Sequence, residues 1–184
     1  MKRPKNMSSI CLASFGFQST SLRGDLPNER FVEISEAVNT ANHVYSYVEQ
    51  SVRLQTHMVE DSKKRLLLEL QEQVDVLVQR VFEKLDLERV CYSLALCYFD
   101  RFIGSIAEDI NPTHIPYYYV GSLCLAQKYL DDDHYINRDF SLLTGVSIKD
   151  FNRLELSILK TLEFKLEASM SDISQYFSPY ELRA

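Results

Sequence analysis

The sequence offers little that indicates catalysis or metal binding. Its five glycines form no phosphate-binding loop, and its four histidines include no pair at metal-ligand spacing. The cysteines lack C-x-x-C spacing, which argues against a zinc site and is typical of small buried residues in a reducing compartment. They are Cys11, Cys91, Cys97 and Cys124. We therefore expect no enzyme activity, no catalytic residue, no metal and no cofactor.

Long apolar runs and positive charge are also scarce. The longest apolar candidate, Ile115 to Gln127, is shorter than the roughly 18 residues of a membrane-spanning helix and contains a proline. The formal net charge of −6 disfavours broad attraction to nucleic acid or to an anionic membrane. The opening "MKRPKNMSS" lacks the apolar core of a secretory signal, and its "KRPK" resembles a nuclear-import patch or simply a solvated terminus. We expect an intracellular protein, in the nucleus, the cytoplasm or both.

Apolar residues at helical spacing fill most of the 184-residue chain, and clear two-residue alternation is absent. We expect an all-α protein with a flexible tail at 1–27 and a long amphipathic helix at 28–60. The main helical domain would cover 61–168, and a short helix and tail would follow at 169–184. The fragment "EDSKK" at 60–64 is expected to separate the long helix from the next one.

Two helices carry apolar residues on most of their faces, which is typical of helices at the centre of a domain. One is expected at 87–103, and the other runs from the prolines at 112 and 116 to Leu130. A short helical turn would follow in "INRDFSLLTG". Ser147 and Asp150 resemble a capping box that opens a last long helix, which ends near Leu162.

Two charged residues lie where apolar ones are expected. On a helical wheel Glu155 falls inside the apolar arc of its helix, which consists of Ile148, Phe151, Ile158, Leu159 and Leu162. Lys128 ends an uncharged run and shares a side with the small residues Gly121 and Cys124. Because a carboxylate on a packing face is costly unless it is paired, we expect Lys128 and Glu155 to lie close together at a shared surface. Alternatively, both lie at the rim and extend into water.

Three aspartates at 131–133 follow the same helix. They face the negative end of its dipole, an unfavourable position that an external cation would relieve. A solvated loop is the simpler alternative, and three consecutive acids lack the spacing of a calcium loop.

The segments "YSLALCYFDRF", "LCLAQKYLDDDHYIN" and "GVSIKDFNRLELSILKTLEFKL" together resemble successive helices of a cyclin box. The resemblance covers about Leu66 to Leu166 and is strongest to the phosphate-system cyclins of fungi and the P- or U-type cyclins. It implies a single box of five helices with a long additional N-terminal helix. The motifs assign structural roles to Asp100, Arg101, Phe102, Asn152 and Leu154.

The resemblance further implies a regulatory subunit that binds and activates a cyclin-dependent serine/threonine kinase. Lys128 and Glu155 match the pair with which cyclins hold the kinase, and Asp131 or Asp132 is expected to meet an arginine of its activation segment. A cyclin-fold adaptor that binds no kinase is the alternative, and a homodimer is possible but not expected.

Two positions depart from the family. The residue aligned to face Asp100 is Gln71 where many cyclins carry arginine, so Asp100 is expected to pair with Arg101 or Arg80. The chain also lacks the Met-Arg-Ala-Ile-Leu patch that docks substrates, so that mode of substrate recruitment is not expected here.

Overall fold

The computed structural model describes residues 28–106 and 110–177. The tail expected at 1–27 and the end of the chain from 178 therefore lie outside the described residues. Within the described ranges the regular structure is entirely helical, as the sequence predicts. In chain order the elements are α2 (Asn28–Leu54), α3 (Glu60–Lys84), α4 (Arg89–Ser105), the 3-10 turn η1 (Pro112–His114), α5 (Ile115–Leu130), α6 (Asn137–Thr144), α7 (Ile148–Thr161) and α8 (Met170–Ser174).

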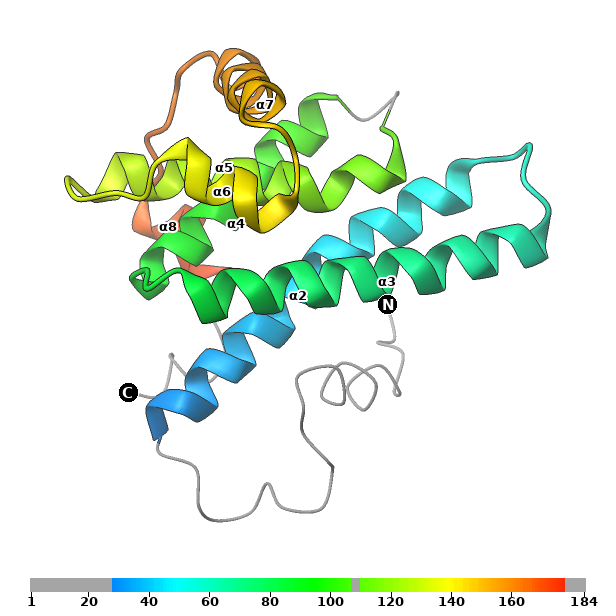
Figure 1. Cartoon of the computed structure of the whole chain (residues 1–184), viewed down its shortest axis with the longest axis horizontal. Coiled ribbons are helices and arrows are strands. Elements are labelled where there is room, and N and C mark those ends of the chain that lie inside the picture. The colour runs from blue at the N-terminus through cyan, green and yellow to red at the C-terminus, as the bar shows by residue number, and fades with distance from the viewer. Residues whose placement is uncertain (1–27, 107–109, 178–184) are drawn as a thin grey trace.

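Helices α2 and α3 form a long antiparallel hairpin (Figure 1). The prediction that "EDSKK" interrupts the helices is wrong, because α3 begins at Glu60 and the turn lies at 55–59. Glu60 and Asp61 stabilise the positive N-terminal end of α3. Each also lies near a lysine three residues later, with Lys63 3.3 Å from Glu60 and Lys64 3.9 Å from Asp61.

Helices α4 and α5 pack against each other at the centre of the fold, as their apolar surfaces predict. Residues 91–99 of α4 and 119–127 of α5 are all buried. Figure 1 shows α7 on one side of this pair and the α2–α3 hairpin on the other. This arrangement leaves the C-terminal end of α5 uncovered, and Lys128 lies there.

Helix α6 is short and depends on α7 for its position. Phe140 on α6 and Phe151 on α7 are fully buried, with parallel rings whose centroids lie 5.8 Å apart. Burial of each ring contributes about 1.5–3 kcal/mol. Ser147 caps α7 by accepting a hydrogen bond from the Asp150 amide at 3.2 Å, and its hydroxyl donates to the Asp150 carboxylate at 2.6 Å. These contacts join α6 to α7 and cap the start of α7.

Asp100 on α4 connects three segments of the chain. Its Oδ1 lies 2.6 Å from His43 Nε2 on α2, and its Oδ2 accepts a 2.7 Å hydrogen bond from Tyr176, which follows α8. The prediction that Asp100 pairs with Arg101 or Arg80 is therefore wrong. Arg101 is the next residue in the same helix, so its side chain leaves in another direction. Arg80 lies on α3 beside Tyr117 of α5.

The other two residues of the "DRF" motif also hold the fold together. Arg101 donates a 3.0 Å hydrogen bond to the Glu167 carbonyl and lies 3.6 Å from Asp172, which connects α4 to α8. Phe102 is buried, and its ring meets that of Tyr118 edge-on at 5.0 Å. The "DRF" side chains thus reach α2, α5 and the C-terminal segment.

Candidate functional site

Helix α5 places Lys128 at the edge of the core. The preceding residues 119–127 are buried without a formal charge, and Lys128 is the basic residue of the last turn, where the helix dipole favours a cation. Its side chain is 27% exposed. Lys128 can therefore reach both its own domain and a partner.

Helix α7 places Glu155 opposite Lys128. A close contact between α5 and α7 is possible because Gly121 has no side chain: a Cβ there would lie 2.7 Å from Ile158 Cδ1 and 3.3 Å from Leu154 Cγ. The close approach beside Gly121 is thus made by a helix of the same chain. Leu154 is half-buried in this contact, and Glu155, the next residue, is only 14% exposed.

The two charges meet, as the sequence predicts. Lys128 Nζ lies 2.6 Å from Glu155 Oε1. Asn137, the first residue of α6, hydrogen-bonds to both: it accepts from Lys128, and its Nδ2 donates to Glu155 Oε2 at 2.6 Å. Asn152 on α7 completes the group by accepting from the same Nδ2 at 2.8 Å. We call these four residues the anchor cluster.

The contacts of the anchor cluster compensate for the free-energy cost of burying the Glu155 carboxylate on α7. Removing a carboxylate from water costs several kcal/mol unless opposite charge and hydrogen bonds compensate, and Glu155 has both. Cys124 lies beneath the cluster, with its Sγ 3.5 Å from Asn137 Oδ1. Burial raises the pKa of the Cys124 thiol to about 12, so it is neutral near pH 7 and adds no charge.

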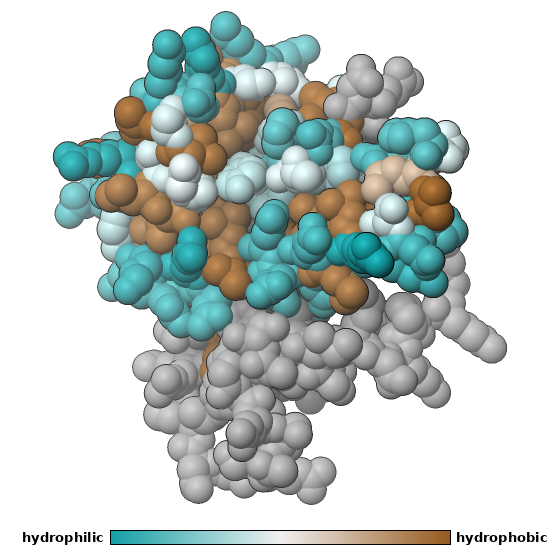
Figure 2. All heavy atoms as spheres, turned by 45° about the vertical axis from the view of Figure 1, so that its right-hand side comes forward, coloured by the Kyte–Doolittle hydropathy of each residue, from teal (hydrophilic) through white to brown (hydrophobic). Residues whose placement is uncertain are grey.

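Large apolar side chains are exposed on the elements that carry the cluster. Tyr129 on α5 is 48% exposed and Leu156 on α7 is 45% exposed. Other exposed apolar residues on these elements or next to them include Leu130, Ile136, Leu142 and Ile148. On the face shown in Figure 2, apolar residues likewise gather in patches between hydrophilic ones. A partly exposed ion pair with apolar neighbours has the composition of a protein-binding surface.

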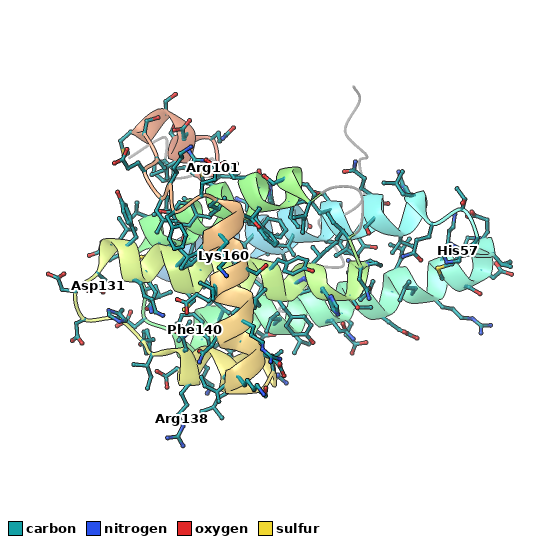
Figure 3. The ribbon with its side chains drawn as sticks, turned by 90° about the horizontal axis from the view of Figure 1, so that it is seen from above. His57, Arg101, Asp131, Arg138, Phe140 and Lys160 are labelled. Atoms are coloured by element: carbon teal, nitrogen blue, oxygen red, sulfur yellow. The ribbon has the colours of Figure 1, made fainter. Side chains whose placement is uncertain are left out.

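The acidic loop lies just beyond α5. Figure 3 shows Asp131 at the far end of this helix, to one side of the point where α7 crosses. Asp131 is exposed, and its Oδ1 accepts a 3.0 Å hydrogen bond from the Asp133 amide. Asp132 is also exposed, and within the described ranges it has no hydrogen-bond or ion-pair partner. Asp132 is thus the aspartate more available to a partner's cation.

One cavity of about 720 Å³ lies between the end of α2, the end of α4 and the segment before η1. Tyr47 and His57 are the titratable side chains among its described lining, and burial together with the charge of Asp100 raises the pKa of Tyr47 to about 12. No described helix is both long and apolar enough to span a membrane.

Asn137 was not predicted as a member of the site. An asparagine at the start of a short helix usually has a local capping role, so the sequence contains no sign of a contact with α5 and α7. The assignment of Asn152 as structural agrees with its place in the cluster, although its side chain is exposed.

Comparison with known proteins assigns the family. Residues 41–167 match the family model described as "Cyclin, N-terminal domain". Cyclin-U4-1 of Arabidopsis thaliana is 31% identical over 102 residues, which cover 55% of this chain and 50% of the relative. Cyclin-P3-1 of Oryza sativa subsp. japonica is 25% identical over 103 residues, which cover 56% of this chain and 44% of the relative.

The chain spans about half the length of the curated relatives it matches, or somewhat less. No solved structure matches it. The family model, the P- and U-type relatives and the all-helical fold agree with one another and confirm the resemblance inferred from the three helical segments. The chain belongs to the cyclin family.

Proposed function

We propose that this chain is a regulatory subunit that binds a cyclin-dependent serine/threonine kinase and stabilises its active conformation. Membership of the cyclin family supports a regulatory role. The resemblance of Lys128 and Glu155 to the kinase-holding pair of cyclins supports the surface around them as the one that would bind.

The anchor cluster is the observation that carries the proposal. Lys128 and Glu155 lie 2.6 Å apart, and both remain partly accessible beside exposed Tyr129 and Leu156. In protein interfaces a few anchors of this kind supply most of the binding energy, while the surrounding apolar contacts exclude water. Neither charge needs a partner protein for stability, so the surface is ready to bind without rearranging.

The mechanism is a shift of population in the kinase. The surface around Lys128 and Glu155 would contact main-chain and side-chain groups that flank the mobile regulatory helix. That contact holds the helix inward, where its glutamate pairs with the ATP-binding lysine. Because the cyclin binds this state more tightly than the inactive one, the active conformation becomes the lower in free energy.

The test is the affinity of the full chain for each purified cyclin-dependent kinase of its source organism, measured by isothermal titration calorimetry. Lys128→Ala and Glu155→Ala are each expected to weaken binding by about 2 kcal/mol or more, which is roughly thirtyfold. Phosphorylation of a model substrate by the kinase should fall in parallel at a fixed subunit concentration.

A matched control is available on α2. Arg53 and Glu49 form an ion pair of the same 2.6 Å length on a face remote from the cluster, and Arg53→Ala should leave affinity unchanged. Unchanged dissociation constants for folded Lys128→Ala and Glu155→Ala would contradict the proposed anchors. Failure of every kinase to bind the unaltered chain would instead favour an adaptor that binds no kinase.

A further inference from the structure

Asn137 contacts both charges of the anchor cluster at once. Its Oδ1 accepts a hydrogen bond from Lys128, and its Nδ2 donates at 2.6 Å to Glu155 Oε2. Chemistry determines the orientation of this amide, because an ammonium only donates hydrogen bonds and a carboxylate only accepts them. Among short side chains, an amide carries an acceptor and a donor on the same carbon, as this position requires.

The contacts of Asn137 leave specific hydrogen-bond donors and acceptors of the cluster free for a partner. Lys128 has three N–H groups, and two of them are used by Glu155 Oε1 and Asn137 Oδ1. Both hydrogens of Asn137 Nδ2 are used by Glu155 and Asn152. One hydrogen of Lys128 therefore remains for a partner acceptor, and Oε2 of Glu155 can accept a further bond, whereas Oε1 lies near the Cys124 thiol as well as Lys128.

Asn137 is itself held by a buried residue of α5. Gln127, which is fully buried, donates a 2.7 Å hydrogen bond to the Tyr135 carbonyl and accepts a 3.1 Å hydrogen bond from the Tyr135 amide. The Ile136 amide then donates at 3.0 Å to Asp139, which secures the first turn of α6. The backbone just before Asn137 is thus fixed to α5 at Gln127, the residue next to Lys128 in sequence.

We propose that Asn137 is a positioning residue of the kinase-binding surface, which holds Lys128 and Glu155 in the arrangement that the partner recognises. This inference rests on the proposed function. A lysine head on a four-carbon stem loses rotamer freedom when it binds. Asn137 restricts Lys128 before binding, which lowers the entropic cost and favours the complex.

The experiment is a double-mutant cycle on the full chain with a cyclin-dependent kinase that binds it. Asn137→Ala is expected to raise the dissociation constant about tenfold, because a hydrogen bond to a charged group is lost. In a Lys128→Ala background the same change should raise the dissociation constant only about threefold or less, because the effects of contacting residues are coupled. An equal loss in both backgrounds indicates a general structural effect and overturns the proposal.

A second readout does not need the kinase. The order parameter of the Lys128 ammonium, measured by ¹⁵N relaxation in the free chain, is expected to fall in Asn137→Ala. Asn137→Ser, whose short hydroxyl cannot reach both charges, replaces Asn137→Ala should the alanine variant unfold. An unchanged Lys128 order parameter in the folded variant would overturn the positioning role.

The matched control is another asparagine at the start of a helical segment. Asn111 Oδ1 accepts a 3.0 Å hydrogen bond from the Thr113 amide, at the opposite end of α5 and roughly 20 Å from Lys128. Asn111→Ala should leave affinity unchanged. If Lys128→Ala weakens binding and Asn137→Ala does not, the inference about Asn137 fails alone. If Lys128→Ala has no effect, the proposed function fails with it.

Discussion

The side chain of Ile158 on α7 packs directly against Gly121 on α5, where an added Cβ would lie 2.7 Å from Ile158 Cδ1. This contact allows α7 to approach α5 closely, and Glu155 lies one turn before Ile158. The distance between Lys128 and Glu155 therefore depends on a position that has no side chain.

Gly121→Ala is expected to destabilise the chain by about 1–2 kcal/mol, because overpacking exceeds the gain in helix propensity. Gly104→Ala is the matched control: Gly104 also lies in a helix, but a Cβ there would meet nothing within 4 Å. That variant should gain about 0.5–1 kcal/mol. Urea denaturation of both variants measures the difference, and equal effects would contradict the close contact.

Asp100→Ala should reduce the free energy of unfolding by about 1–2 kcal/mol, since His43 and Tyr176 each lose a hydrogen bond to a carboxylate. The control is Asp61→Ala in the first turn of α3. Asp61 is exposed and lies 3.9 Å from Lys64, a pair worth about 0.5 kcal/mol or less. Matching urea midpoints for the two variants would show that Asp100 does not join the three segments energetically.

Stability should fall as pH rises above about 9. The Cys124 thiol has an ordinary pKa of 9.0, and burial raises the pKa to about 12 in the folded chain. Below pH 9 the thiol keeps its proton in both states, so its contribution is complete. Above pH 9 the unfolded chain loses the proton first, and the contribution declines until the pH reaches the folded pKa.

Cys124→Ala should remove this component. Its curve of unfolding free energy against pH is expected to be flatter above pH 9, by up to about 1.4 kcal/mol per pH unit. Denaturant titrations at about pH 8, 9 and 10 measure both slopes. Parallel curves for the variant and the unaltered chain would show that Cys124 does not titrate with a raised pKa.

Asp132→Lys is expected to raise the stability of the chain and to lower its activation of the kinase. The folded chain should gain about 0.3–1 kcal/mol because a cation replaces an anion near the C-terminal end of α5. Kinase activation should decrease about tenfold if Asp132 meets an arginine of the activation segment. Activity of the bound kinase measures the effect, with Asp61→Lys on the hairpin as the control. Full activation by Asp132→Lys would exclude this role.

The sequence predicted much of the fold because helical periodicity is a local signal. The buried faces of α4 and α5 and the entry of α5 at its prolines follow from residues close together in the chain. The start of α3 was misplaced, because charges at 60–64 suggest a loop although they stabilise a helix N-terminus. Near a helix end the same residue types suit both structures.

The Lys128–Glu155 pair was predictable for a different reason. Each charge was out of place on its own helix, and two opposite charges in that situation favour each other. No comparable feature of the sequence indicated the contacts of Asn137 or of Asp100. An asparagine and a histidine are ordinary on a helix surface, so their partners remain unknown until the helices are placed.

The sequence alone determined that this chain is helical, which two helices are central, and that Lys128 and Glu155 need an opposite charge. These properties depend on periodicity and on the cost of burying charge, and both can be evaluated along one helix. Only the tertiary structure decided that Asn137 bridges the pair and that His43 meets Asp100, 57 residues away. The physical reason is that hydrogen bonds act over about 3 Å, so they depend on where the helices cross. Those crossings depend on the absence of a side chain at Gly121 and on the packing of residues far apart in the chain.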